Sequence, residues 1–518
     1  MNYKVVIHTL GQLLKALSVI LIFPFIVALI ESEFSVQILL AFLGPSVFCL
    51  GLGFILAHGK LKDSTFYTRE GIVIVGFGWI IISLVGMLPF IIATAGVEEL
   101  SDLSVIDWFF ESVSGFSTTG ASILHPVSGS HQIDIMYETG YKSVLFWRSL
   151  THWVGGMGVL IFILAVIPSS AGASGIHLMQ AESTGPTIDK LVSKMSSTAR
   201  ILYLMYAALT VLEIILLSLA SIFDSKMNIF HAFVLSMGTA GTGGFAASSS
   251  SLGLYGPYVK IVVTVFMLLF GVNFNIYFCL LAKKFKDVLQ SEELRFYLGF
   301  IIVAIFSMTL IVFYSMKDVF AEYSSFGDVA IDVSFTAVSL TTSTGYATKD
   351  FTIWPDICRY MLLLMMFIGA CAGSTGGGFK CSRFLLLVKI ALVRCYKVIN
   401  PRGVYSVKMD GKRVADETIQ GVSGYFAIYI LILLLSILFV AIDLSVRGIS
   451  DLVTAFSSVL TCLNNIGPGM APAIGPSGTF FGFSIPIKLL LSVLMLLGRL
   501  EIYPILMLFF PKTYSRGI

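Results

Sequence analysis

Charged residues are scarce in this chain: Asp, Glu, Lys and Arg account for 12% of its 518 residues, against about 25% in a typical soluble domain. Hydrophobic residues account for 57%, and the mean hydropathy is +0.92. These values exclude a soluble globular protein and predict an integral membrane protein. The formal net charge is only +3, and no basic patch interleaved with aromatic residues is present, so nucleic acid is not expected as a partner.

Motifs for metal, redox and nucleotide chemistry are also missing. The seven cysteines form no CxxC pair and the seven histidines form no HExxH motif, which gives a bound metal cofactor no support. No GxGxxG motif follows a strand-like segment, so we expect no bound dinucleotide or other organic cofactor. His152 and His231 lie in different parts of the chain, with no catalytic cluster around them. An enzyme is therefore not expected.

Long apolar segments are what the sequence has instead. A helix needs about 20 apolar residues to cross about 30 Å of hydrocarbon, and ten segments are interpreted as crossings. They cover residues 8–30, 37–58, 70–96, 143–167, 198–222, 258–282, 295–316, 357–395 (interrupted), 420–443 and 484–510. Basic residues gather in every second loop, which predicts that both termini are cytoplasmic.

Four shorter apolar segments lie between these crossings, at residues 104–117, 228–240, 328–342 and 449–463. Each is too short to cross a bilayer and is predicted to form a re-entrant half-helix that enters from the outside. Each runs into a strip rich in glycine or in hydroxyl and amide residues. The strips are Ser117–Ser122, Gly241–Ala246, Val338–Thr348 and Asn464–Gly469.

The strips recur along the chain in one orientation. Aligning Gly120, Gly243, Gly345 and Gly467 gives intervals of 123, 102 and 122 residues. Because an even number of crossings separates the copies, all four can meet around one axis. Glycine lets carbonyls point at that axis, as in potassium channels, and the C-termini of the half-helices add negative potential there. The strips therefore predict a filter for a cation.

The predicted fold is all-α: an integral membrane protein with four pseudo-symmetric repeats of helix, re-entrant half-helix and helix around one pore, plus two N-terminal helices. The expected divisions are residues 1–69 for the two N-terminal helices, then 70–197, 198–292, 293–419 and 420–518 for the four pore repeats. Inverted repeats, which many secondary carriers use, would instead place alternate copies upside down.

The third repeat contains a glycine-rich interruption. The run Ala372–Gly378 cannot hold a stable helix, since each glycine costs about 1 kcal/mol relative to alanine. Two half-helices, Cys358–Ala370 and Phe379–Tyr396, are expected on either side of it. The run is either a movable gate beneath the filter or a kink that serves packing. A phosphate-binding loop is excluded, because Phe379 interrupts the required Gly-Lys sequence and no strand precedes the run.

Several ionisable residues lie in apolar surroundings. Arg499 is in the last crossing, where a charge costs roughly 2.5–3.5 kcal/mol on insertion scales. It either forms an electrostatic barrier beneath the filter or pairs with a carboxylate or with helix-end carbonyls. Lys380 either acts in the same way or extends its ammonium group toward the membrane surface. Asp107 and Glu111 share one helix face and either concentrate cations at the mouth or bond locally.

In their order and spacing, the motifs of this chain resemble those of the TrkH-type pore subunits in the Trk/Ktr/HKT superfamily of potassium transporters. The resemblance covers essentially the whole chain and is carried by Ser114–Gly120, Thr242–Phe245, Thr341–Thr348, Asn464–Gly469, Gly373–Lys380 and Gly498–Glu501. It implies a potassium filter formed by four glycines of one chain, whereas sodium-permeable plant relatives have serine in the first strip. The implied function is potassium uptake across the bacterial inner membrane.

The resemblance also assigns individual residues. The filter residues are Thr119, Gly120, Thr242, Gly243, Thr344, Gly345, Asn465, Ile466 and Gly467. Potassium, the transported ion, is expected at Thr118, Thr119, Thr242, Gly243, Thr344, Gly345, Asn465 and Ile466. The gate residues are Gly373, Gly376, Gly377, Gly378, Lys380 and Arg499. The fourth strip departs from the Thr-Gly pattern, so the four strips are not equivalent. The ion selectivity of the filter is therefore expected to be looser than in a symmetric tetramer.

Two partners are implied in addition to the lipid bilayer. One is a second copy of the chain, giving a homodimer through the periphery of the last repeats. The other is a cytosolic nucleotide-binding regulatory subunit resembling TrkA, expected to dock on residues 168–200 and 397–419. The alternative function is a Na⁺- or H⁺-coupled secondary symporter, which would need acidic residues at the membrane midplane; Glu213 is the most notable of the few present.

Overall fold

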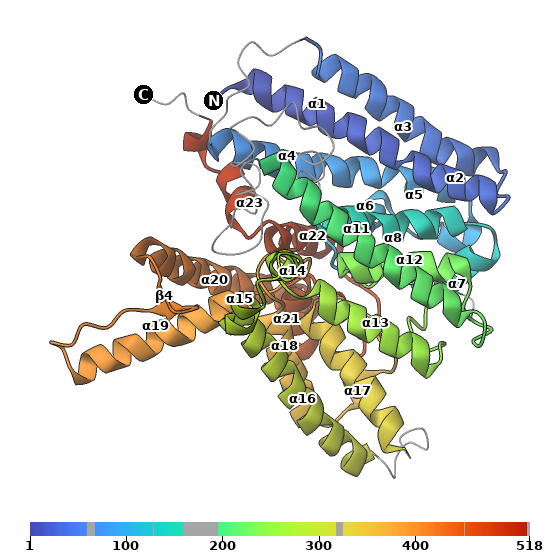
Figure 1. Ribbon diagram of the computed structural model, residues 1–518. Helices are drawn as coiled ribbons and strands as arrows, with labels where there is room; N and C mark the ends of the chain where they lie inside the picture. Colours follow the sequence, from blue (N-terminus) through green and yellow to red (C-terminus); the bar gives the residue numbers. More distant parts are fainter. Residues whose placement is uncertain (60–67, 128, 159–194, 317–324, 450, 515–518) are drawn as a thin grey trace.

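The computed structural model describes residues 1–518 except 60–67, 128, 159–194, 317–324, 450 and 515–518. Almost all of the regular structure is helical (Figure 1). Strands occur in the described residues only as two antiparallel hairpins, β1 (Pro126–Val127) with β2 (Ser130–His131) and β3 (Lys408–Met409) with β4 (Lys412–Arg413). The expected all-α fold is therefore confirmed.

Four times, the chain forms a long helix, then a short helix with a non-helical strip, then a further helix. The first unit consists of α4 (Thr68–Gly86) with α5 (Leu88–Thr94), α6 (Val105–Phe116) and α8 (Lys142–Gly156). The second consists of α11 (Met195–Ala220), α12 (Ile229–Gly241) and α13 (Pro257–Phe270) with α14 (Phe274–Leu281). The third consists of α16 (Glu292–Met316), α17 (Phe326–Thr341) and α18 (Asp356–Ile368) with α19 (Cys381–Ile399). The fourth unit is α20 (Asp416–Val446), α21 (Leu452–Leu463) and α22 (Ile485–Arg499) with α23 (Tyr503–Leu508). The N-terminal helices are α1 (Tyr3–Ile20), α2 (Ile22–Ile30) and α3 (Val36–Leu56), and the connecting helices are α7 (Gln132–Glu138) and α15 (Phe285–Gln290).

The four units form a closed ring. The helix after each strip contacts the short helix of the next unit: α8 contacts α12, α13 contacts α17, and α18 contacts α21. The ring closes because α22 of the fourth unit contacts α6 of the first. All four strips therefore face one central region. Outside the ring, α1 packs against α4, α2 against α8 and α3 against α5.

Side-chain caps explain where three of the short helices begin. Ser104 and Asp107 form a reciprocal capping box at the start of α6. The Asn228 side chain accepts a hydrogen bond from His231 N at the start of α12, and Asp451 accepts from two backbone amides at the start of α21. These helices have at most 16 residues, and their ends lie within three residues of the expected half-helices.

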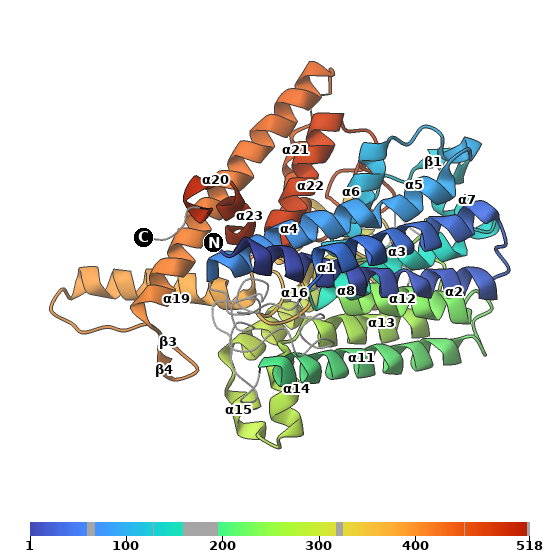
Figure 2. The same cartoon turned by 90° about the horizontal axis from the view of Figure 1, so that it is seen from above.

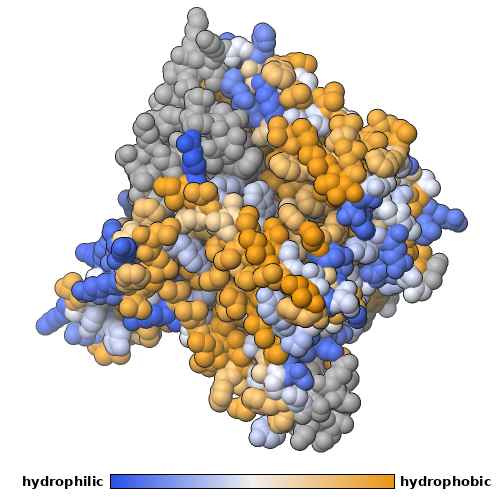
Figure 3. Space-filling view, turned by 45° about the vertical axis from the view of Figure 1, so that its right-hand side comes forward, coloured by the Kyte–Doolittle hydropathy of each residue, from blue (hydrophilic) through white to orange (hydrophobic). Residues whose placement is uncertain are grey.

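Six helices of the described residues are long and apolar enough to cross a bilayer, or seven if the bent pair α13–α14 counts as one. The six are Tyr3–Ile30, Val36–Leu56, Arg69–Thr94, Ala199–Ala220, Glu292–Met316 and Asp416–Val446, and each overlaps an expected crossing. Figure 3 shows a broad apolar surface over one face of the helices, with hydrophilic residues gathered toward its two sides. This surface fits a multi-pass membrane protein.

Two expected crossings are interrupted, and their prediction as single helices was wrong. The segment 258–282 bends by 89° between α13 and α14. The segment 484–510 breaks after Arg499, where Glu501 and Ile502 take positive φ values of 57° and 67°. The interruption expected within 357–395 is present, between α18 and α19. The end of the expected crossing 143–167 lies outside the described residues.

Candidate ion-conducting site

All four short helices end in the same backbone turn. In each, a backbone N–H donates to the carbonyl five residues earlier: Thr119 to Ser114 (2.9 Å), Gly243 to Gly238 (2.9 Å), Thr344 to Ser339 (2.8 Å) and Ile466 to Thr461 (3.0 Å). The residue before each donor is left-handed, with φ between 54° and 58°: Thr118, Thr242, Ser343 and Asn465. This turn is a known way to end a helix. It stops each half-helix near the centre and sends the chain back as an extended strip.

A glycine with positive φ follows each turn: Gly120 (77°), Gly244 (80°), Gly345 (81°) and Gly467 (94°). A Cβ atom on each glycine would meet a backbone oxygen of the next strip: 2.0 Å from Gly243 O, 2.2 Å from Thr344 O, 2.0 Å from Ile466 O and 2.8 Å from Thr119 O, respectively. Both the backbone conformation and the close approach therefore require glycine. These contacts bring the four strips together in chain order around one axis.

The expected alignment of the second strip was wrong by one residue. Gly244, rather than Gly243, takes the position of the other three glycines. Gly243 instead corresponds to Thr119, Thr344 and Ile466, the residues whose carbonyls lie against those glycines. Because two glycines are adjacent here, the sequence allows either Gly243 or Gly244 to be aligned with the glycines of the other strips. The left-handed turn at Thr242 decides between them.

Arg148 of α8 connects the first strip with the second. Its Nε pairs with Glu111 Oε1 at 2.5 Å, and its other nitrogens donate to Ser122 Oγ (3.0 Å) and Ala246 O (3.4 Å). The guanidinium also lies 3.6 Å from the ring centroid of Phe245. A planar cation with five donors suits such a bridging position. Arg148 could not be singled out from the sequence, because its partners are far apart along the chain.

Tyr346 and Asn465 join further pairs of strips. The Tyr346 hydroxyl donates to Leu235 O and Phe245 O, both at 3.1 Å, which connects the third strip with the second. The Asn465 amide donates to Thr119 Oγ1 at 2.9 Å and to Met495 O at 2.8 Å, which connects the fourth strip with the first. The departure of the fourth strip from the Thr-Gly pattern thus has a structural consequence, because asparagine supplies a bridge between strips.

The acidic residues of α6 have both local and distant bonding partners. Asp107 pairs with Lys488 of α22 and caps α6, while Glu111 accepts from Ile123 N (3.0 Å) and pairs with Arg148. Both side chains are buried. The expected hydrogen bonding is therefore present at both residues, and a role in concentrating cations stays a prediction.

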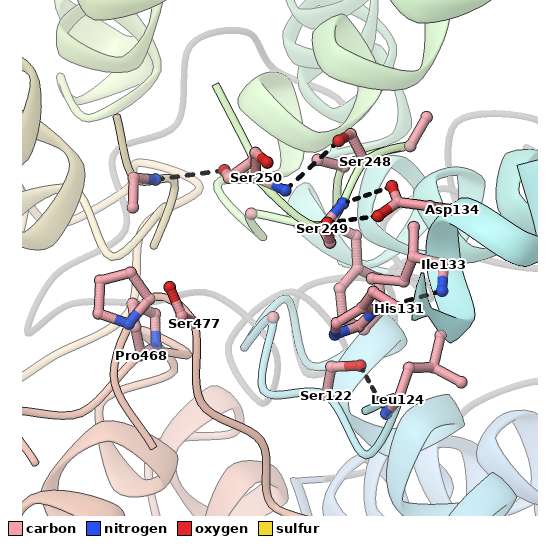
Figure 4. A pocket seen from close by; sticks show the side chains of 18 of the residues that line it. Ser122, Leu124, His131, Ile133, Asp134, Ser248, Ser249, Ser250, Pro468 and Ser477 are labelled. Atoms are coloured by element: carbon pink, nitrogen blue, oxygen red, sulfur yellow. Dashed lines mark hydrogen bonds between the residues drawn. The ribbon is translucent and has the colours of Figure 1, made fainter. Parts of the chain in front are cut away.

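A cavity of about 820 Å³ lies outside the ring and is lined by all four strip glycines, Gly120, Gly244, Gly345 and Gly467. Many of the residues in its walls are small, and polar and apolar side chains both line it. Asp134 of α7 accepts hydrogen bonds from Ser249 N (3.0 Å) and from the Ser249 hydroxyl (2.5 Å), and Ser248 and Ser250 flank this contact (Figure 4). Pro468 and Ser477 line another part of the wall (Figure 4). The cavity therefore gives open space beside all four strip glycines.

His131 in the cavity wall should remain neutral at physiological pH. Burial lowers its pKa from 6.5 to about 4, Arg148 and His125 act in the same direction, and Asp134 opposes them. Accordingly, its Nδ1 accepts a hydrogen bond from Ile133 N at 3.2 Å and caps α7. The unfolded chain takes up this proton first, so stability should fall as the pH drops from about 6.5 toward about 4.

Replacing His131 by Asn should reduce that loss. Asparagine keeps a capping acceptor for α7 but has no titrating group. Thermal unfolding of wild type and His131→Asn at about pH 7.5 and about pH 5 measures the effect. The variant should lose less melting temperature on acidification; equal losses in the two proteins would contradict the assigned pKa.

The glycine-rich segment between α18 and α19 lies directly against the inner ends of the strips. Gly377 N donates to Ser343 Oγ at 2.6 Å, and a Cβ atom on Gly377 would lie 2.3 Å from Asn464 O. A Cβ atom on Gly376 would lie 2.8 Å from Thr342 O. The segment is non-helical, as expected, and its residues are mostly buried. It therefore stands at the inner end of the third and fourth strips.

The break between α13 and α14 provides backbone partners for this segment. Cys371 N donates to Gly271 O (3.1 Å), Phe274 N donates to Gly373 O (3.0 Å), and the Thr375 hydroxyl donates to Phe270 O (3.2 Å). An unwound backbone at membrane depth must be satisfied by protein, and two unwound segments here satisfy each other. The sequence signal that could have indicated this break is Gly271 followed closely by Asn273.

Arg499 connects the glycine-rich segment with α8. It donates to Thr375 O (2.7 Å), to Gly155 O (2.6 Å) and to Gly156 O. The side chain is buried at 5% exposure. The expected bonding to helix-end carbonyls is therefore present at Gly155 and Gly156, and the electrostatic barrier stays a prediction.

Lys380 does not extend toward the membrane surface, so that alternative was wrong. The side chain is 1% exposed, and Nζ donates back to Gly376 O within the same segment. The neighbouring Arg383 pairs with Glu501. Two cationic side chains, Lys380 and Arg499, therefore hold carbonyls of one loop.

A ring of four short helices, with a cavity on one side of their strips and a glycine-rich loop on the other, is an architecture typical of a membrane transport protein. A family model, TrkH, described as a cation transport protein, matches residues 45–516. The chain belongs to the TrkH family of cation transport proteins. This is a family of transporters rather than enzymes.

Relatives cover the full length. The chain is 32% identical over 518 residues to the Trk system potassium uptake protein TrkH of Escherichia coli (strain K12), covering 99% of this chain and 100% of that protein. It is 34% identical over 521 residues to the Trk system potassium uptake protein TrkG of the same strain, covering 98% of each. The crystal structure of the potassium transporter TrkH from Vibrio parahaemolyticus matches with a TM-score of 0.83 at 28% identity, covering 99% of this chain and 100% of that one.

Proposed function

We propose that this protein takes up potassium across the bacterial inner membrane through the ring of four strips. The observation that best supports this proposal is the packing of one glycine of each strip against a backbone carbonyl of the next strip around one axis. The glycines are Gly120, Gly244, Gly345 and Gly467. Rings of backbone carbonyls can replace the hydration shell of a potassium ion. Relatives named as potassium uptake proteins support potassium as the ion.

The proposed ion-contacting residues are the backbone groups around these glycines. They are Thr118, Thr119, Gly120, Thr242, Gly243, Gly244, Thr344, Gly345, Asn465, Ile466 and Gly467. The carbonyls of Thr119, Gly243, Thr344 and Ile466 form the layer beside the glycines. The C-terminal ends of the four half-helices add partial negative charge at the inner side of this layer.

The glycine-rich loop is the proposed gate, formed by Gly373, Gly376, Gly377, Gly378, Lys380 and Arg499. Its close approaches to Thr342, Ser343 and Asn464 support a gate at the inner end of the proposed filter. Glycines allow it to move, and the two cations oppose the passage of another cation. Opening would require the loop to leave the bonds with Arg499 and with the α13–α14 break.

The proposed orientation places both termini in the cytoplasm. The start of α1 and the end of the chain lie together, since the Tyr3 hydroxyl donates to Tyr514 O at 3.3 Å. The proposed division of the chain is two N-terminal helices in 1–69 and pore repeats in 70–197, 198–292, 293–419 and 420–518. The helical order of each described unit supports this division.

The homodimer and the regulatory subunit are proposed on surface features. Helix α19 projects from the bundle (Figures 1 and 2) and exposes Val388, Leu392 and Tyr396 at four-residue intervals. An apolar stripe of this kind suits contact with a second copy. The β3–β4 hairpin within 397–419 supplies exposed basic residues for a cytosolic nucleotide-binding subunit resembling TrkA; most of the other loop, 168–200, lies outside the described residues.

Uptake into proteoliposomes tests the function. With a potassium gradient alone, wild-type protein should carry potassium until the equilibrium potential is reached, with or without a proton or sodium gradient. Accumulation beyond that potential when a gradient is applied would instead favour the coupled symporter. Glu213, fully buried in α11, is the acidic residue that supports this second candidate. No potassium flux above empty vesicles, at verified insertion, would contradict both.

A further inference from the structure

Glu293, at the start of α16, bonds both sides of the glycine-rich loop. Its Oε1 accepts a hydrogen bond from Ala372 N at 2.7 Å and from Ser382 N at 3.1 Å. Ala372 precedes most of the glycines, and Ser382 is in the first turn of α19. The side chain is 7% exposed. One carboxylate oxygen therefore binds the chain on both sides of the loop glycines, before them at Ala372 and after them at Ser382.

Helix α19 depends on this carboxylate for its cap. The residue at its N-cap is Lys380, which has a φ of 72° and makes no side-chain capping hydrogen bond. The first N–H groups of a helix need acceptors, and a negative charge beside them is favourable. Glu293 provides both from another helix. Loss of the carboxylate would free the start of α19 as well as the loop amide of Ala372.

The neighbouring residue Glu292 makes contacts of a different kind. It pairs with Lys389, two turns further along α19, and its N–H donates to Asp410 Oδ1 at 2.7 Å. Lys389 also donates to Lys408 O of strand β3 at 2.8 Å. Glu292 thus joins α16 to the middle of α19 and to the β3–β4 hairpin, whereas Glu293 reaches the loop itself.

We propose that Glu293 is a positioning residue that latches the glycine-rich loop beneath the filter. The latch works by binding Ala372 and Ser382 at once, so that the loop can leave the inner end of the filter only when both bonds break. The effect on permeation passes through the loop, and the proposal therefore rests on the proposed function of that loop as a gate. Through Glu292, the β3–β4 hairpin is connected to the start of α16, where Glu293 lies. A force applied to the hairpin can therefore be transmitted to Glu293.

The test compares Glu293→Ala with Glu292→Ala in potassium flux into proteoliposomes. Loss of the two bonds should favour the open position and raise flux at least about tenfold in Glu293→Ala, a change in the range of one lost hydrogen bond to a charged group. Glu292→Ala, which removes an α16–α19 ion pair without touching the loop, should stay within about twofold of wild type. Glu293→Gln keeps the shape but not the charge, and it should give a smaller rise.

Hydrogen exchange of the backbone amides in 371–382 tests whether Glu293 holds the loop, independently of whether the loop acts as a gate. Faster exchange there in Glu293→Ala, but not in Glu292→Ala, supports the latch directly. Unchanged exchange overturns it whatever the flux. Faster exchange with unchanged flux in both Glu293→Ala and Arg499→Ala keeps the latch but contradicts the gate. If Glu293→Ala does not assemble, Glu293→Gln carries the same comparison.

Discussion

Replacing Gly345 by Ser is expected to abolish potassium uptake. The glycine has a φ of 81°, which costs a side-chain residue about 1 kcal/mol or more. In addition, a Cβ atom would lie 2.0 Å from Ile466 O and 2.9 Å from Pro468 Cδ. The third and fourth strips must separate to make room, which displaces the carbonyls of the ring. Growth of a potassium-uptake-deficient bacterium at low potassium measures the effect, and a loss of at least about tenfold in uptake is expected.

Gly299→Ser is the matched control. Gly299 lies in α16 of the same repeat, and a Cβ atom there meets nothing within 4 Å. The control should support growth like the wild type. Wild-type growth by Gly345→Ser, at equal amounts of protein in the membrane, would contradict the proposed filter.

Replacing Arg499 by Ala is expected to raise potassium flux, by about tenfold. The substitution removes a buried positive charge and the hydrogen bond to Thr375 O, and it releases the loop from Gly155 and Gly156 of α8. Both changes lower the barrier at the inner end of the filter, since the charge repels a cation and the bonds hold the loop in place. Flux into proteoliposomes, normalised to inserted protein, measures the result.

Two variants refine this experiment. Arg499→Lys keeps the charge but lacks the planar fork that bonds α8 and the loop together, so an intermediate flux is expected. Arg447→Ala removes an arginine that donates to Gly482 O near the end of α20, away from the loop, and should leave flux unchanged. Unchanged or lower flux in Arg499→Ala would count against a barrier at this position.

The half-helices could be predicted from the sequence because their signals are local. Ser104, Asn228 and Asp451 cap their own helices, and an apolar segment as short as Leu452–Leu463 cannot cross a bilayer. The interruption of the third repeat is local for the same reason. Consecutive glycines disfavour a helix whatever surrounds them.

The partners of the buried charges could not be predicted. Lys488 of the fourth repeat pairs with Asp107 of the first, where the ring closes, and Arg499 bonds residues of the first and third repeats. The partners of the break after Phe270 belong to the same group: Gly271 and Asn273 indicate a break, but only the tertiary structure shows that the glycine-rich loop bonds it. Each of these depends on which helices become neighbours when the ring closes.

The sequence by itself determined that this is a multi-pass membrane protein with four half-helices and four glycine-containing strips, because apolar length, helix caps and helix-breaking glycines act over a few residues. Tertiary structure alone decided the register of the second strip, in which Gly244 takes the place expected for Gly243. Sequence spacing cannot choose between two adjacent glycines, since both have the required freedom. The choice is made by the left-handed turn at Thr242 and by the carbonyl of Thr344, which leaves room for no side chain at Gly244.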